Sequence, residues 1–161
     1  MESVGNPAHH YTCHVRIALG SDHAALDLKD LLATHLVAGG HSVLDLGTNS
    51  TESVDYPDFG AAVGRAVVEG SADLGVCCCG TGIGISIAAN KVAGVRAAVV
   101  HDVTTAHLAR EHNDANVICF GARVIGSLVA TEALDAFLAA TFAGDRHQRR
   151  IEKIQRLEEA Q

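Results

Sequence analysis

The sequence predicts a three-layer α/β/α domain built on a five-stranded parallel β-sheet and followed by a C-terminal helical tail. Two observations support this prediction. Short apolar runs of strand length alternate with longer segments whose apolar residues recur at helical spacing. Glycines and helix-capping residues lie between these segments, where the chain turns from one element to the next. Repeated strand–helix units of this kind imply a parallel sheet covered by helices on both faces.

The first half of the chain contains two strand–helix units. Hydrophobic periodicity indicates a strand, a helix, a second strand, a polar loop and a second helix, at residues 15–19, 22–38, 42–46, 47–58 and 59–69. Ser21 or Asp22 can cap the first helix, and the pair Gly39-Gly40 ends it. Gly70 ends the second helix in the same way.

The second half adds more strand–helix units and the tail. Its strands are apolar runs at residues 74–79, 95–100 and 116–120. An alanine-rich helix follows the glycine turn after the first of these strands, and further helices extend to about His112 and over 127–142. The charged tail helix, 145–160, has an apolar stripe too narrow for the domain core, so we expect it to lie along the edge of the protein or against a second subunit. Together these elements predict a Rossmann-like fold.

Length and composition limit the class of protein. A chain of 161 residues is long enough for one domain with its own core, which we place at residues 15–161. The polar segment 1–14 shows no periodicity and is expected to be a disordered extension. The net charge of −7 argues against nucleic acid or an anionic membrane surface as a partner. No apolar run has membrane-spanning length and no signal peptide is evident, so we expect a cytoplasmic protein.

The cysteines favour packing and chemistry over a disulfide framework or a metal site. Cys77, Cys78 and Cys79 are consecutive in a predicted strand, so neighbouring side chains point to opposite faces. They cannot all face one ion, no paired Cys-x-x-Cys spacing occurs, and no metal is expected. We interpret Cys77 and Cys78 as small buried hydrophobes. Cys79 differs because it precedes a helix N-terminus, whose N–H groups favour a thiolate that can act as base or nucleophile.

Polar and reactive side chains gather where the predicted strands end. Ligands of parallel α/β sheets bind outside the carboxyl ends of the strands, where this chain places Asp22, His23, Tyr56, Cys79, Thr81, His101 and Asp102. Asp22 is explained equally well as a helix cap. In the tail, Arg146 and Arg150 share one helix face, a spacing suited to holding one phosphate, although a charge run is usually a solvated face.

The turn Gly80-Thr81-Gly82-Ile83-Gly84 also suggests a second class of function, nucleotide binding. Asp102 follows the next strand, as a ribose-binding acid does in dinucleotide-binding folds. The glycines, however, are spaced G-x-G-x-G rather than G-x-G-x-x-G, and they follow the third strand instead of the first. Nucleotide binding therefore stays an alternative to catalysis by the cysteine.

Taken together, the motifs resemble those of the ribose-5-phosphate isomerase B family, whose superfamily includes the galactose-6-phosphate isomerase subunits. The matching segments run in order from about residue 15 to 157 and are Gly20-Ser21-Asp22-His23-Ala24, Asp55-Tyr56-Pro57, 79–91, 110–116, Gly121-Ala122-Arg123 and 146–150. One subgroup of that family replaces the cysteine by a glutamate farther along the turn. Ile85 occupies that place here, so the chain resembles the cysteine type.

The resemblance implies a role for each matching residue. Cys79 would be the base that moves a proton between C1 and C2 of the sugar, and His112 would act in opening the furanose ring. Thr81 and the N–H groups of the glycine turn would stabilise the enediolate oxygen. The residues that would bind the sugar or its phosphate are Asp22, His23, Tyr56, Gly80, Gly82, Gly84, Asn113, Arg123, Arg146 and Arg150.

The resemblance further implies an aldose–ketose isomerase of the pentose phosphate pathway, which interconverts D-ribose 5-phosphate and D-ribulose 5-phosphate through a cis-enediolate. It implies no cofactor and no metal, and a homo-oligomer, either dimer or tetramer, whose site draws on both subunits. The alternatives are isomerisation of a six-carbon sugar phosphate (allose or galactose 6-phosphate), the nucleotide-binding module, and a non-catalytic sugar-phosphate sensor. Cys79, His112 and both arginines lie on one chain, which favours a self-sufficient homo-oligomer.

Overall fold

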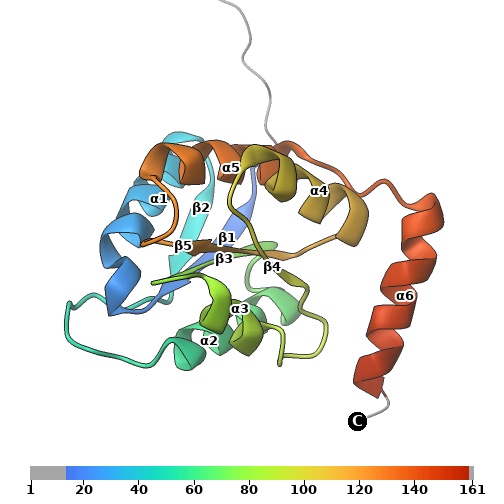
Figure 1. The fold of residues 1–161 in the computed structure, drawn as a ribbon, viewed down its shortest axis with the longest axis horizontal. Helices are drawn as coiled ribbons and strands as arrows, with labels where there is room; N and C mark the ends of the chain where they lie inside the picture. Colours follow the sequence, from blue (N-terminus) through green and yellow to red (C-terminus); the bar gives the residue numbers. More distant parts are fainter. Residues whose placement is uncertain (1–13, 160–161) are drawn as a thin grey trace, which may run out of the picture.

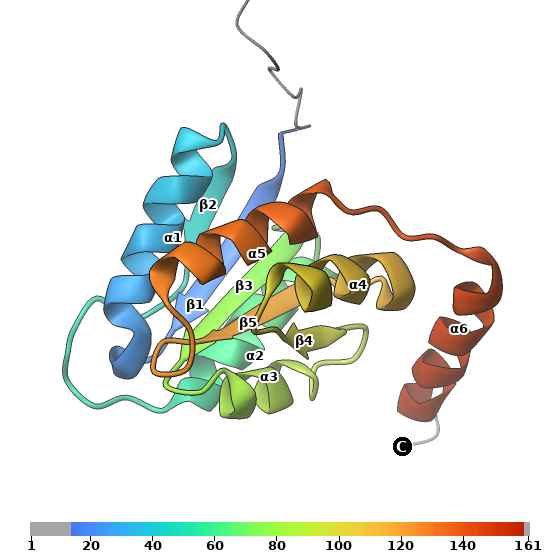
Figure 2. The same cartoon turned by 45° about the horizontal axis from the view of Figure 1, so that its top comes forward.

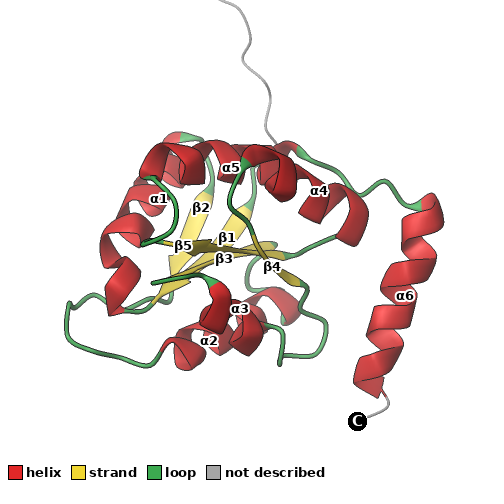
Figure 3. Cartoon of the chain, viewed as in Figure 1, coloured by secondary structure: helices red, strands yellow, loops and turns green. Residues whose placement is uncertain are grey.

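The computed structural model describes residues 14–159, and its centre is one five-stranded sheet (Figures 1 and 3). The strands are β1 (Arg16–Ser21), β2 (Ser42–Asp45), β3 (Leu74–Cys79), β4 (Ala97–Val99) and β5 (Val117–Gly121). They lie in the order β2-β1-β3-β5-β4, and every neighbouring pair is parallel. The predicted five-stranded parallel sheet is confirmed.

Helices cover both faces of this sheet. They are α1 (Leu26–Ala38), entered through the short 3₁₀ turn η1 (His23–Ala25), α2 (Tyr56–Val68), α3 (Ile83–Ala89), α4 (Val103–Asn113), α5 (Ser127–Ala139) and α6 (Asp145–Glu159). Figure 1 shows α1, α4 and α5 on one face and α2 and α3 on the other, which confirms the three layers. The tail helix α6 lies beside α4, apart from both helical layers (Figure 2).

The sheet divides the core into two parts, because successive side chains of a strand point to opposite faces. On the side of α1, α4 and α5, the cluster contains Leu32 and Phe137, both fully buried. On the side of α2 and α3, the second cluster contains Val63, which is also fully buried. Cys78 belongs to the first cluster and Cys77 to the second, and both are 0% exposed, so their interpretation as packing residues is confirmed.

Two predicted element bounds are wrong. The loop expected to run to residue 58 ends at Asp55, and α2 begins at Tyr56, because Pro57 suits the first helical turn, where its missing N–H needs no partner. The strand expected at 95–100 is the three-residue β4. The side chain of Asn116 accepts the N–H of Arg96 at 2.7 Å, and this contact takes the place of a ladder hydrogen bond before β4 begins.

Residues 1–13 and 160–161 lie outside the described part of the chain, and with them most of the segment that we expected to be disordered. The last residue of that segment, His14, is described, and its Nδ1 lies 2.7 Å from the carbonyl oxygen of Gly40. Within residues 14–159, no helix combines the length and apolar character that a membrane span requires.

The carboxyl ends of β1 and β3 lie next to one another, with Ser21 in register with Cys78. From these two ends the chain continues to opposite faces of the sheet, into α1 after β1 and into α3 after β3. Adjacent strands whose helices diverge in this way leave room for a ligand between them, and parallel α/β sheets commonly bind ligands at such a point.

Candidate active site

The centre of the candidate site is the thiol of Cys79, at the end of β3. Its Sγ accepts a hydrogen bond from the backbone N–H of Gly82 at 3.1 Å, and the residue is only 4% exposed. Gly82 has a φ of +76° and lies against β5, where a Cβ would be 2.9 Å from the carbonyl carbon of Phe120. Only glycine fits both the left-handed backbone and this close approach. The turn therefore aims an N–H group at the sulfur.

The end of β5 holds this turn from the other side. Arg123 and the residue before it, Ala122, donate their backbone N–H groups to the carbonyl oxygens of Gly80 and Cys79, at 3.0 and 2.9 Å. The Arg123 guanidinium lies over Gly80, where a Cβ would be 3.4 Å from Nη1. A cationic side chain thus covers the backbone next to the thiol. Thr81 is exposed on the same turn.

Tyr56 reaches the turn from the first turn of α2. A Cβ on Gly84 would lie 2.6 Å from the Tyr56 ring and 2.9 Å from its hydroxyl oxygen, so the ring contacts the backbone of α3 directly. The side chain is 40% exposed, so it can line an open pocket. This contact explains why the third glycine of the turn carries no side chain.

Asp22 and His23 follow β1 on the opposite side of the thiol. The Asp22 backbone N–H donates to the carbonyl oxygen of Cys78 at 3.3 Å, and its carboxylate accepts the N–H of Ala24 at 3.0 Å as the cap of η1. The His23 Nδ1 accepts the N–H of Val54 at 3.2 Å. Because Nδ1 is an acceptor, the neutral ring carries its proton on Nε2.

The predicted residues of this region form what we call the thiol cluster, at the carboxyl edge of the sheet: Asp22, His23, Tyr56, Cys79, Gly80, Thr81, Gly82, Gly84 and Arg123. The structure brings these residues together from β1, β3, α2 and the segment after β5. The other four predicted site residues lie elsewhere.

We call the second group the cationic cluster, which comprises His112, Asn113, Arg146, His147 and Arg150. His112 lies near the end of α4, and its ring stacks on that of His147 from α6, with centroids 4.3 Å apart and an interplanar angle of 10°. Arg146 Nε donates to His147 Nε2 at 3.4 Å. Arg146 and Arg150 are exposed one helical turn apart, as predicted from their spacing. His147 was not predicted as a site residue.

The charges of this cluster suit an anion. Burial lowers the pKa of His147, and the nearby positive groups of His112, Arg146 and Arg150 lower it further. A cation is thus disfavoured on this ring by burial and by the nearby positive groups, although the Glu111 carboxylate acts in the opposite direction. A phosphate placed here would relieve that repulsion and accept charge-assisted hydrogen bonds from the arginines.

The thiol cluster lies at the carboxyl ends of the strands, and the cationic cluster lies near their amino ends. The carbonyl oxygens of Asn113 and Asp114 accept from Arg96 Nε at 3.1 and 3.0 Å, and Arg96 precedes β4 at the edge where the strands begin. Cys79 lies at the edge where the strands end. Six residues of β3 separate the two edges by roughly 16 Å at about 3.3 Å per residue. Within one chain, Cys79 therefore does not meet His112.

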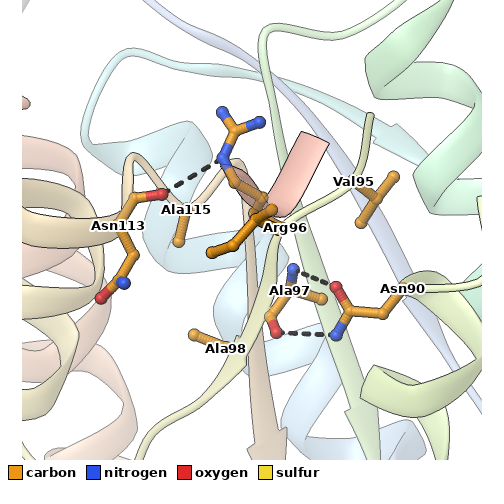
Figure 4. A pocket seen from close by; sticks show the side chains of 8 residues that line it. Asn90, Val95, Arg96, Ala97, Ala98, Asn113 and Ala115 are labelled. Carbon is orange, nitrogen blue, oxygen red and sulfur yellow. Dashed lines mark hydrogen bonds between the residues drawn. The ribbon is translucent and has the colours of Figure 1, made fainter. Parts of the chain in front are cut away.

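A pocket of about 250 Å³ lies beside the cationic cluster, along the outer edge of β4 (Figure 4). Its lining includes Asn113 and, from α6, Ile154. Asn90 closes part of this edge, because its side-chain amide donates to the carbonyl oxygen of Ala97 at 2.9 Å and accepts the Ala97 N–H at 2.8 Å. Within the described residues, no group of three or more His, Cys, Asp or Glu is arranged to hold a metal ion.

The carboxylate that suggested nucleotide binding has another partner. Asp102 caps α4, and its Oδ1 accepts the backbone N–H of Thr105 at 2.7 Å. An N-cap carboxylate engaged in this way explains the position of the residue at the end of β4 without a ribose.

The fold and site define a class of protein: a parallel α/β domain with a thiol at its switch point and a separate cationic cluster suited to a phosphate. Residues 17–154 match the family described as Ribose/Galactose Isomerase. Ribose-5-phosphate isomerase B of Escherichia coli strain K12 is 48% identical over 144 residues, which cover 89% of this chain and 97% of the relative.

Solved structures show the same likeness. Ribose-5-phosphate isomerase B of Clostridium thermocellum superposes with a TM-score of 0.89 at 49% identity, over 90% of this chain and 98% of that one. The Mycoplasma genitalium enzyme, solved with bound ribulose-5-phosphate, gives a TM-score of 0.87 at 45% identity, over 91% and 97% of the two chains. The chain belongs to the ribose/galactose isomerase family.

Proposed function

We propose that this protein is an aldose–ketose isomerase that interconverts D-ribose 5-phosphate and D-ribulose 5-phosphate. The observation that carries the proposal is the thiol of Cys79, which accepts the Gly82 N–H at the switch point of the sheet. Membership of the ribose/galactose isomerase family supports it, as does the bound ribulose-5-phosphate of the Mycoplasma genitalium relative.

In this proposal Cys79 is the base. It takes the proton from C2 of the open-chain aldose and returns it to C1, while the hydroxyl proton moves from O2 to O1, so that the carbonyl group moves from C1 to C2 through a cis-enediolate. The Gly82 N–H donates to the Cys79 sulfur and so helps to hold it in place. Thr81 Oγ1 accepts the N–H of Ile83 at 3.3 Å, which leaves the hydroxyl hydrogen of Thr81 to donate to the enediolate oxygen.

The cationic cluster would bind the phosphate and open the sugar ring. Arg146 and Arg150 would hold the 5-phosphate, with His23 and Arg123 contributing from the thiol cluster. These phosphate contacts supply binding energy away from the reacting carbons and so orient the open chain over Cys79. His112 is the proposed acid–base group for ring opening, with Asn113 beside it at the end of α4.

We further propose a homodimer in which each site joins the thiol cluster of one subunit to the cationic cluster of the other. The separation of the two clusters within one chain supports this arrangement. Apolar surface supports it too, because α3 exposes Ile83 and Ile87 by 55% and 56%, and α6 exposes Ile154 and Leu157 by 44% and 67%. Such surface is usual where a second copy packs.

The proposed enzyme acts in the cytoplasm, in the pentose phosphate pathway, whose two pentose 5-phosphates it interconverts. Four cysteines in the described part of the chain are free, namely Cys77, Cys78, Cys79 and Cys119. Free thiols fit a reducing compartment.

A coupled assay with ribose 5-phosphate and with allose or galactose 6-phosphate tests the reaction and the substrate. We expect a higher kcat/KM for the five-carbon substrate. Cys79→Ala is expected to abolish turnover while leaving ligand binding intact, and Cys77→Ala, the same change at a packing residue, is the matched control. Undiminished turnover by Cys79→Ala would reject the base, and a higher kcat/KM for a six-carbon substrate would assign the alternative reaction.

Mixing two inactive variants tests the shared site. Cys79→Ala and His112→Ala are each expected to be inactive alone. After joint unfolding and refolding, half of the dimers would contain both variants, and each would have one intact site. About a quarter of the wild-type activity should therefore return. If Cys79 and His112 of the same chain formed the site, mixing would restore nothing.

A further inference from the structure

Lys29 is a buried cation to which the sequence assigned no role. It lies on the inner face of α1, its side chain is 1% exposed, and its Nζ lies 2.5 Å from Asp45 Oδ2 and 2.9 Å from Asp30 Oδ1. Lysine is almost never fully buried without a partner. Burial acts to lower the pKa of Lys29, but the hydrogen bonds to Asp45 and Asp30 outweigh this effect and raise the pKa. Lys29 is therefore charged inside the protein.

The ion pair fixes the turn that follows β2. The other oxygen of Asp45 accepts the Gly47 N–H at 2.9 Å, which closes an Asx-type turn. Gly47 lies against both the lysine and the end of β1, since a Cβ there would be 2.5 Å from Lys29 Cδ and 2.8 Å from the Ser21 nitrogen. Thr48 completes the contact by donating its N–H to the Ser21 carbonyl oxygen at 3.1 Å.

These contacts end at the thiol cluster. Ser21 immediately precedes Asp22 and His23, and the loop after Gly47 leads to Val54, which donates to the His23 ring. Four of the six buried polar or charged residues in the described part of the chain gather in this region: Ser21, Asp22, Lys29 and Thr48. Such a concentration of buried polar groups is costly in a protein interior, and it surrounds the β1 end of the site.

We propose that Lys29 is a positioning residue of the isomerase: through Asp45 it holds the turn at Gly47 against Ser21 and so places Asp22 and His23 for substrate binding. This inference rests on the proposed function. Lys29 itself does not touch the substrate. Its effect reaches the sugar phosphate through the backbone of β1.

Lys29→Met tests the proposal, because methionine keeps an unbranched stem over Gly47 and removes the charge. We expect KM for ribose 5-phosphate to rise on the order of ten- to a hundredfold, because displacement of binding groups by about 1 Å has effects of this size. The rate at which iodoacetamide alkylates Cys79 is expected to stay within about twofold, because β5 rather than Lys29 holds that turn.

Asp30→Asn is the matched control. Asp30 is the exposed partner of the same lysine, with 63% of its side chain in water, so its loss should leave KM unchanged. If Lys29→Met does not fold, Asp45→Asn tests the same contact, because in that variant Lys29 keeps Asp30 as a partner. Asp45→Asn is expected to raise KM in the same direction.

A purely structural role gives a different result. Folded Lys29→Met or Asp45→Asn protein with a lower Tm but the wild-type KM would overturn the positioning role. Calorimetric titration of ribose 5-phosphate into Cys79→Ala protein, with and without Lys29→Met, measures the same effect on binding without turnover, and an equal Kd would also overturn it. Wild-type protein without isomerase activity would contradict the proposed function instead.

Discussion

Gly121→Ala adds one methyl group at the tightest backbone contact of the thiol cluster. Gly121 ends β5 and is in register with Cys79 on β3. A Cβ on Gly121 would lie 2.5 Å from both the carbonyl carbon and the carbonyl oxygen of Thr81. These are backbone atoms, so no side chain can rotate away to make room. The turn between Cys79 and Gly82 must move as a unit.

The size of the effect follows from this overlap. Ordinary van der Waals contact begins at 3.4 Å, so the turn must shift by about 1 Å. Overpacking of this kind costs about 1 to 3 kcal/mol of stability. A shift of about 1 Å in a catalytic group lowers kcat/KM about a hundredfold. That loss corresponds to about 2.7 kcal/mol of transition-state stabilisation.

The assay compares kcat/KM for ribose 5-phosphate and the Tm of Gly121→Ala with those of Gly126→Ala. Gly126 lies in the same connection before α5, and a Cβ there would meet no atom within 4 Å. The control is expected to match the wild type in both measurements. Wild-type kcat/KM in Gly121→Ala would refute the argument that this glycine sets the position of the thiol turn.

Two further predictions concern stability. The folded-state pKa of His147 lies below its ordinary value of 6.5, so the unfolded chain binds more protons near that pH, and the free energy of unfolding should fall as pH drops through it. Urea unfolding across this range should show a weaker pH dependence for His147→Gln, and an unchanged slope would contradict the burial and charge argument. Asp102→Ala removes the cap of α4 and should cost about 1 kcal/mol in the same experiment without changing kcat. If the wild-type protein binds NAD saturably and Asp102→Ala does not, the result would instead favour the nucleotide-binding alternative.

Much of the fold could be predicted because its elements follow strong local patterns. Strand β3 begins and ends where its apolar run does, at Leu74 and Cys79. The start of α2 was placed too late because Pro57 suits a first helical turn as well as a loop. The bound of β4 was wrong because a side chain from a distant segment decides it. Asn116 takes the place of a ladder partner next to Arg96, and the periodicity of the β4 segment contains no sign of that contact.

The residues of the candidate site likewise comprise some that the sequence predicts and some that it does not. The residues of the thiol cluster follow strand ends or a glycine turn, and parallel-sheet topology gathers such positions at one edge. His147 and Lys29 were missed because their roles depend on contacts between elements distant in sequence. His147 acquires its surroundings from α4, and Lys29 acquires its partner from the end of β2. Composition and spacing along one helix carry no signal for either contact.

The Asn90 amide blocks the outer edge of β4. An exposed edge strand is a template on which another strand can add, and such addition leads to open-ended aggregation. At Ala97 both backbone groups that would receive a new strand are already occupied by one side chain of the same molecule. Association through a continuous sheet is thereby opposed at this edge. The exposed apolar side chains of α3 and α6 offer helical surfaces for a second copy instead, and helical contacts can close into a finite assembly.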